Sequence, residues 1–153
     1  MLNLSELVRG GTLCLSKAGL VVGTTTSKAQ IVAPNGAGVD FAIKGILYHV
    51  ADGDNLVVLT GDVQTALYTN LYLVCINASN TITVVQGTEV LTADLASGKK
   101  VLAWPEATAN TCPIGAIKIV ATAAFTPGTT ALGTGNTVTY YDLFAVPDAP
   151  LQA

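Results

Sequence analysis

The chain has 153 residues, of which half are apolar and 11% are charged, and its net charge is −3. So high an apolar fraction excludes a disordered chain, and the acidic balance argues against a nucleic-acid binder, which would present a basic face. The longest apolar run, Leu71 to Ile76, is far shorter than the roughly 20 residues that span a bilayer. The sequence therefore predicts a folded, soluble protein with neither nucleic acid nor membrane as a partner.

The first ten residues predict a short helix. Asn3 is placed to cap it, with Glu6 reaching back to complete a capping box, and Leu2 and Leu7 sit where a hydrophobic staple would close. The glycine pair at residues 10–11 ends it. So short a helix is not stable alone, so we expect it to dock on its own body or on a neighbour.

Residues 12–38 predict an extended arm with one or two short strands, because short apolar pieces alternate with Thr-rich and Pro/Gly-rich turns. Basic residues outnumber acidic ones over residues 1–35, whereas acidic residues dominate 36–98. This asymmetry has two readings, namely chance in a small sample or two ends that face different surroundings. We divide the chain into an N-terminal helix and extended arm, 1–38, and a β-sandwich body, 39–153.

The body is predicted to be all β. Apolar residues alternate or run together in short segments separated by turn residues, and this spacing is typical of a sandwich or barrel. The predicted strands cover residues 40–49, 56–59, 67–76, 81–85, 101–104, 114–121 and 138–146. A second short helix is possible only within 89–100. We therefore expect a β-sandwich or jelly-roll-like barrel of about seven or eight strands.

His49 is the only histidine, so a nucleophilic site built on a histidine base would have to use it. It comes shortly before Asp52 and Asp54 in the sequence. One reading is therefore a base with a carboxylate partner, and the other is a polar residue at the end of a strand. No nucleophile motif accompanies it, and we assign no catalytic residue and expect no enzyme.

Two groups of carboxylates suggest a metal site or a glycosidase site. The Asp52–Asn55 cluster suggests calcium, but the ligand spacing of an EF-hand loop fails, and a turn rich in Asp and Asn explains these residues. Glu89 and Asp94 could form the carboxylate pair of a glycosidase, although few aromatic platforms accompany them. We predict no metal site and no cofactor.

Three cysteines, Cys14, Cys75 and Cys112, are far apart and odd in number. Their spacing fits neither a disulfide scaffold nor a zinc site. The first residues lack the basic and apolar regions of a secretory signal. We therefore expect synthesis in a reducing cytoplasm.

The low charge and the abundance of Thr, Ala and Gly favour assembly, since obligate interfaces resemble a core cut in half; a small, neutral β domain is the other reading. Trp104 is either a core residue at a strand end or an interface anchor, a role in which Trp is enriched. The uncharged loop 122–136 has a length typical of functional or intermolecular segments. We select Trp104, Phe125 and Leu132 as candidate residues of an oligomer interface.

The last third of the chain resembles small virion proteins of tailed bacteriophages, namely head decoration, cement or head-fibre-like proteins. The resemblance covers residues 100–147. The segments that carry it are Trp104–Glu106, Cys112–Ile119, Phe125–Leu132 and Val138–Asp142. It implies a non-enzymatic β protein on the capsid exterior that binds the assembled major capsid protein and stabilises the shell.

The resemblance also implies self-association, with a homotrimer favoured and a homodimer as the alternative. We expect the basic arm to dock on the capsid, and many weak contacts to sum by avidity. The candidate docking residues are Leu2, Leu7, Arg9, Lys17 and Lys28. Deletion of residues 1–35 should then leave the body folded but abolish shell binding. A phage tail-fibre or other receptor-binding module is the alternative function.

Overall fold

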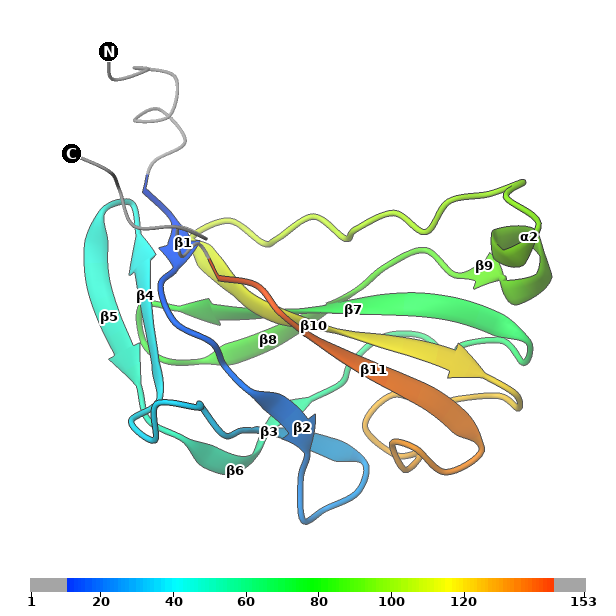
Figure 1. Ribbon diagram of the computed structural model, residues 1–153, viewed down its shortest axis with the longest axis horizontal. Helices are drawn as coiled ribbons and strands as arrows, with labels where there is room; N and C mark the ends of the chain where they lie inside the picture. Colours follow the sequence, from blue (N-terminus) through cyan, green and yellow to red (C-terminus); the bar gives the residue numbers. More distant parts are fainter. Residues whose placement is uncertain (1–10, 145–153) are drawn as a thin grey trace.

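The computed structural model describes residues 11–144, which form antiparallel sheets and one short helix (Figure 1). The strands are β1 (Leu13–Cys14), β2 (Leu20–Val22), β3 (Lys28–Ile31), β4 (Val39–Ile43), β5 (Ile46–Val50), β6 (Gly53–Val58), β7 (Tyr68–Asn77), β8 (Ile82–Gln86), β9 (Val90–Leu91), β10 (Thr111–Ala121) and β11 (Asn136–Asp142), and the helix is α2 (Thr92–Ala96). The predicted helix in residues 1–10 lies outside the described residues.

The prediction of an all-β fold is confirmed. The described residues hold eleven strands, more than the seven or eight expected, in three sheets that do not close into a barrel. The extra strands are short, such as β1 and β9 with two residues each, and segments that brief carry too little alternation to be seen in a sequence. The finer assignment of a sandwich or jelly roll stays a prediction.

The central sheet has the order β11-β10-β7-β8, with β9 pairing to the start of β7. Its middle strands β7 and β10 are the longest and the most buried, because their apolar residues cover both faces. Tyr72, Val74, Ile117 and Ile119 point to one face and are fully buried there. The two remaining sheets, β1-β4-β5 and β2-β3-β6, lie on this side of the central sheet (Figure 1). Their buried apolar side chains belong to the same core.

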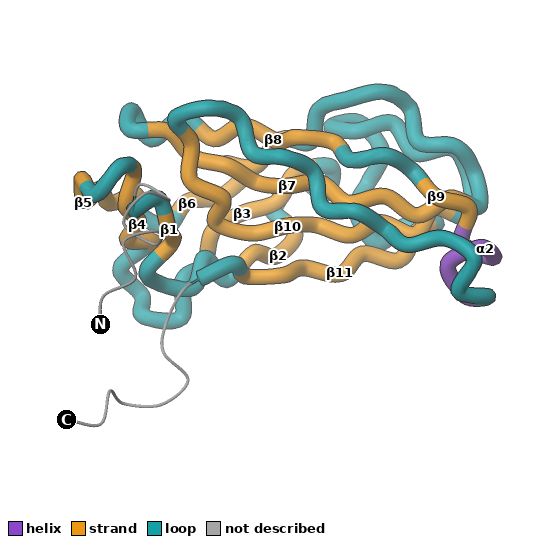
Figure 2. Tube along the Cα trace, turned by 90° about the horizontal axis from the view of Figure 1, so that it is seen from above, coloured by secondary structure: helices purple, strands orange, loops and turns teal. Residues whose placement is uncertain are grey.

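The opposite face of the central sheet is covered by the connection 97–110, which runs across it from α2 back to the start of β10 (Figure 2). Leu73, Cys75 and Ala116 are buried beneath, with Ala107 and Tyr141 packed against them. The strand predicted at 101–104 is absent, because within the described chain no backbone–backbone hydrogen bond holds residues 101–110. This connection is attached by its side chains.

The extended arm predicted up to residue 38 is corrected over its described part, residues 11–38. β1 pairs with β4, and β2 and β3 form a hairpin that pairs with β6. Leu20, Ala29 and Ile31 are at most 3% exposed and belong to the same core as β7 and β10. The Asp142 carboxylate also accepts the backbone N–H of Gly19 at 2.9 Å. Residues 11–38 are therefore an integral part of the body.

Candidate binding surfaces

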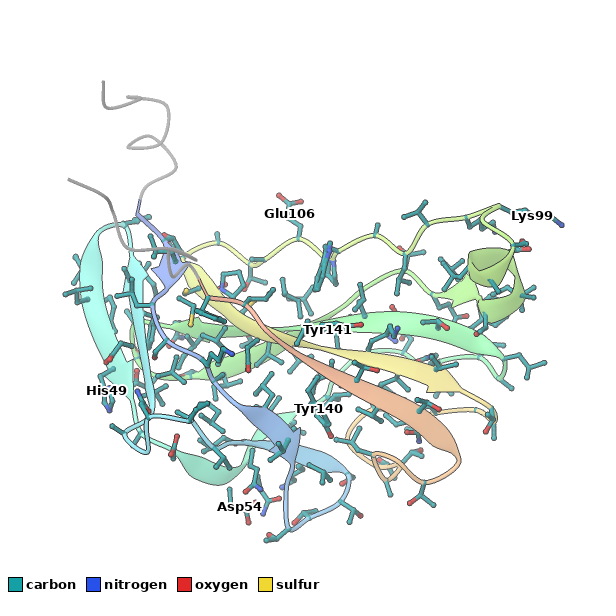
Figure 3. All side chains as sticks on the ribbon, viewed as in Figure 1. His49, Asp54, Lys99, Glu106, Tyr140 and Tyr141 are labelled. Atoms are coloured by element: carbon teal, nitrogen blue, oxygen red, sulfur yellow. The ribbon has the colours of Figure 1, made fainter. Side chains whose placement is uncertain are left out.

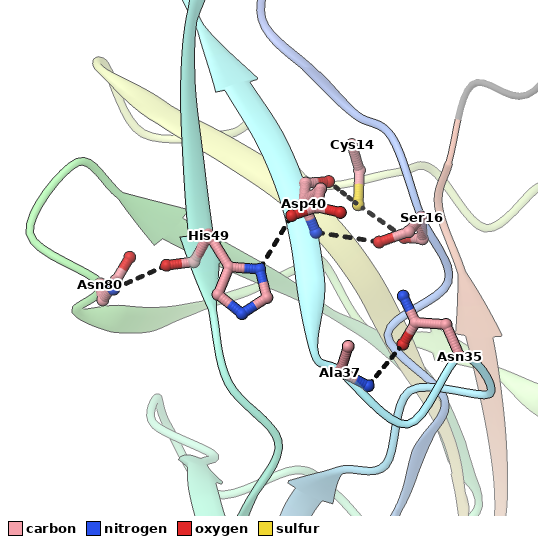
Figure 4. Close-up of polar contacts among 7 residues, drawn as sticks. All are labelled: Cys14, Ser16, Asn35, Ala37, Asp40, His49 and Asn80. Carbon is pink, nitrogen blue, oxygen red and sulfur yellow. Dashed lines mark hydrogen bonds and ion pairs between the residues drawn. The ribbon is translucent and has the colours of Figure 1, made fainter.

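The single histidine forms an exposed cross-strand pair. His49 Nδ1 on β5 lies 2.8 Å from Asp40 Oδ1 on β4, and both side chains are more than half exposed. Asn80 donates to the His49 carbonyl, and Ser16 Oγ accepts the Asp40 N–H (Figure 4). Within the described residues no hydroxyl or thiol is hydrogen-bonded to the imidazole. The carboxylate beside His49 is therefore Asp40, not Asp52 or Asp54 as the sequence suggested.

The Asp52–Asn55 cluster holds the β2–β3 hairpin against β6. Asp54 accepts the N–H and the hydroxyl of Thr24, and Asn55 Oδ1 accepts the Thr25 N–H at 2.9 Å. Asp52 accepts the Ala33 N–H at 2.8 Å. Among the described residues no group of three or more His, Cys, Asp or Glu side chains could hold a metal. These carboxylates act as structural acceptors.

Asp54 should make the fold acid-sensitive. The hydrogen bond from the Thr24 hydroxyl, helped by the Thr24 N–H, holds the pKa of this carboxyl below its ordinary 3.8. Its contribution to stability is therefore complete above pH 3.8 and is lost as the pH falls through the lower folded-state pKa. In urea unfolding at neutral and acid pH, Asp54→Asn should lose less stability on acidification than the wild type. The exposed control Asp62→Asn should behave as the wild type, and an equal acid loss in Asp54→Asn would contradict this assignment.

Glu89 and Asp94 do not form a carboxylate pair across a cleft. Glu89 accepts the N–H and hydroxyl of Thr65 at 2.8 and 2.7 Å, which fixes the turn before β7. Asp94 lies 3.9 Å from Lys100 Nζ at the end of α2. Each carboxylate is thus bound to a different structural partner.

The three cysteines are buried and unpaired in disulfides. Burial raises the pKa of the Cys14 thiol to about 11 and that of Cys112 to about 12, and it also raises the pKa of Cys75. A thiolate is the reactive form of cysteine, so these thiols are inert in the folded state. The prediction that Cys75 is a core residue is confirmed.

The thiols should react only when the chain unfolds. At neutral pH we expect no thiol modification by an aromatic disulfide reagent in the native protein and three equivalents in urea. Because the thiol pKa values are higher in the folded than in the unfolded state, the protonated thiols stabilise the fold below pH 9. This contribution to the free energy of unfolding is lost as the pH rises toward 11–12. Rapid modification of the native protein at neutral pH would show that at least one cysteine is accessible.

The two candidate docking residues that the structure describes, Lys17 and Lys28, do not lie in an extended arm. Lys17 is exposed between β1 and β2, with its Nζ 5.2 Å from the centre of the Phe144 ring. Lys28 lies on β3, opposite Val58 of β6. Leu2, Leu7 and Arg9 lie outside the described residues.

Two of the three candidate interface residues are core residues. Phe125 is 1% exposed and packs its ring on Tyr72, and Leu132 is 7% exposed. Both side chains belong to the main core of their own chain and have no surface to offer to a second copy. The prediction that Phe125 and Leu132 lie in an oligomer interface is therefore wrong. Trp104 is 54% exposed and touches Tyr141 edge to face. The Trp104 side chain borders a cavity of about 380 Å³ that also includes Gly87 and Pro105.

The outer face of the β2-β3-β6 sheet is apolar and open. Ala29 and Val57, which pair across β3 and β6, point into the core, so their strand neighbours point outward. The outward residues Val21, Lys28, Gln30, Val32, Leu56 and Val58 define what we call the valine face. Its four aliphatic members are 40–49% exposed. Sequence reasoning missed this face because it placed residues 12–38 in an arm.

Leu67 is exposed and has an unfavourable backbone conformation. It occupies the third position of the turn closed by Tyr68 N–H to Thr65 O, with a φ of +68°. That position of a type II turn favours Gly or Asn, and an L-residue there costs about 1–2 kcal/mol. The Leu67 backbone is held by Ala121 O and Thr92 N, while its side chain is 63% exposed. No sequence motif indicated this residue.

A mostly apolar cavity of about 310 Å³ lies beside Phe144, near the end of β10 opposite Leu67. It is lined by Leu15, Ser16, Lys17, Pro34, Asn35 and Phe144. Leu15 and Lys17 border it from the β1–β2 connection, and Phe144 closes it from beyond β11.

Comparison with known proteins adds no identity. The chain gives no match to family models, to curated proteins or to solved structures. Over residues 11–144, no helix is long and apolar enough to span a bilayer.

Proposed function

We propose that the protein is a virion structural protein of a tailed phage that binds the outside of the assembled capsid as an oligomer and stabilises the shell. Its sheets are proposed to form a sandwich-like body. The proposal starts from the resemblance of residues 100–147, which contribute β10, β11 and the loop between them. Its partner is the major capsid protein.

The valine face is the observation that carries this proposal. Four aliphatic side chains and Lys28 lie on one side of a three-stranded sheet, with no further charge among the six residues. Contiguous exposed apolar surface is a common mark of a protein contact. We therefore propose that the valine face, and not an extended arm, docks on the capsid. Of the docking residues predicted from the sequence, Lys28 lies on this face.

A charge placed on the valine face should abolish shell binding. The Val58 side chain points outward and is 41% exposed, so the Val58→Asp variant should fold. In cosedimentation with empty capsids we expect saturable binding of the wild type and at least a tenfold loss for Val58→Asp. Leu47→Asp, on β5 away from this face and 71% exposed, is the matched control and should bind as the wild type. Equal binding of all three would refute the valine face as the docking surface.

The second candidate function is a receptor-binding module of the virion. The exposed indole of Trp104 beside its cavity favours it, since ligand sites combine aromatic side chains with a few polar groups. Figure 3 shows that Glu106 on the same connection points away from the sheet. Binding to host cells that is lost in Trp104→Ala, together with no binding to capsids, would support this function over shell binding.

A further inference from the structure

We propose that copies of this chain associate head to tail, with Leu67 of one copy inserted into the cavity beside Phe144 of the next. This contact deepens the oligomer part of the proposed function. It does not depend on capsid binding, because it is made between free subunits.

The backbone conformation of Leu67 is unusual for its residue type. Among residues 11–144, five non-glycine residues have a positive φ. Three of these are asparagines, which tolerate that conformation, and Lys44 belongs to the two-residue β4–β5 hairpin turn. Leu67 is the exception, and glycine would fit its turn better. Its side chain gains little burial within its own chain, since it is 63% exposed. A strained residue whose side chain is so little buried in its own fold indicates a contact outside the chain.

The surroundings of Leu67 and of the Phe144 cavity are complementary in polarity and charge. Val63, four residues earlier, is also 57% exposed, so the turn presents two apolar side chains. The turn is held by Glu89 through Thr65, and Asp62 precedes Val63. The Phe144 cavity exposes mostly apolar surface, although Ser16 and Asn35 also line it, and the Lys17 Nζ lies 5.2 Å from the centre of the Phe144 ring. Exposed apolar side chains with the carboxylates of Asp62 and Glu89 on neighbouring residues thus complement a cavity lined in part by Lys17.

Leu67 and the Phe144 cavity lie near opposite ends of β10. Leu67 is hydrogen-bonded to Ala121 at the end of β10, whereas Phe144 follows β11 near the start of β10, where Leu143 N–H bonds to Ile114 O. The seven steps from residue 114 to residue 121 span roughly 23 Å in a strand. A copy cannot fill its own cavity across that distance, but a neighbour can. Such a heterologous contact gives a ring where the rotation closes and an open chain where it does not.

The experiment is sedimentation velocity over a range of concentrations, combined with thermal unfolding. Leu67→Gly removes both the side chain and the strain, so it should weaken self-association at least tenfold and raise the midpoint of unfolding by a few degrees. Lys44→Gly is the matched control, because it relieves a positive φ elsewhere. It should also raise the midpoint but associate as the wild type. A purely structural Leu67 would leave association unchanged on substitution.

Mixing two variants tests the head-to-tail arrangement. Leu15→Glu places a charge in the cavity, at a side chain already 36% exposed, and keeps Leu67 intact. Neither Leu67→Gly nor Leu15→Glu should associate alone. In an equimolar mixture, Leu67 of the Leu15→Glu chain can enter the intact cavity of the Leu67→Gly chain, so a two-chain species and nothing larger should form. Lys17→Glu replaces Leu15→Glu if the latter does not fold. A monomeric wild type, an unaffected Leu67→Gly or a mixture that stays monomeric would each overturn the proposal. None of these outcomes would bear on capsid binding, which cosedimentation measures separately.

Discussion

Deletion of residues 1–35 should unfold the protein. The truncation removes β1, β2 and β3, and with β3 the only strand to which β6 is hydrogen-bonded within the described residues. It also removes the buried side chains of Leu20 and Ile31. Burial of a large aliphatic side chain contributes about 1.5–3 kcal/mol, and the core on the remaining strands would be uncovered as well. The loss is therefore on the order of 10 kcal/mol, comparable to the whole stability of a domain.

Circular dichroism and thermal unfolding provide the measurement. The truncated chain should show no cooperative transition, whereas a chain that lacks only residues 1–10 keeps every described strand and should melt cooperatively. A cooperative unfolding transition of the chain without residues 1–35, at the wild-type midpoint, would show instead that these residues are a separable arm.

Phe125→Ala should lower the free energy of unfolding by about 3–5 kcal/mol, the range for truncation of a buried phenylalanine. The ring is 1% exposed, lies 6.2 Å from the Tyr72 ring, and is held by a backbone bridge to Gln64. Gln64 is itself fully buried and donates to Tyr68 O and Ile119 O. A cavity at this point would therefore loosen both the aromatic pair and the polar network that positions β7 against β10.

Urea unfolding measures this loss, and Trp104→Ala is the control. Because Trp104 is 54% exposed, its removal should cost about 1 kcal/mol or less. The large difference between the two aromatic residues separates a core role from a surface role. A small loss for Phe125→Ala and a large one for Trp104→Ala would mean that the assignment of the two residues is reversed.

The sequence predicts the central sheet well, because its strands carry strong local signals. The long apolar segment 67–76 becomes β7 (Tyr68–Asn77), and the turn after it leads into β8 (Ile82–Gln86). The segment 114–121 lies within β10, and the uncharged stretch after it is a long loop, as expected. These elements bury a continuous apolar run or alternate over many residues, so the pattern is visible without tertiary contacts.

The small sheets and the binding surfaces could not be predicted in this way. β2 and β3 have three and four residues, and their pairing is fixed by distant groups such as Asp54 on Thr24 and Asp142 on Gly19. A short strand takes its stability from such tertiary contacts and not from its own sequence. The same holds for Phe125, an aromatic residue in a loop whose burial depends on Tyr72. The valine face and the strained Leu67 follow only from strand register and backbone conformation.

We propose that the protein coats a capsid through its valine face. Electron cryomicroscopy of empty capsids mixed with the purified protein can show this contact. We predict ordered density outside the shell, in which the β2-β3-β6 sheet turns Val21, Lys28 and Val58 toward the major capsid protein. Shells without added density, or density in which this face points to solvent, would contradict the account.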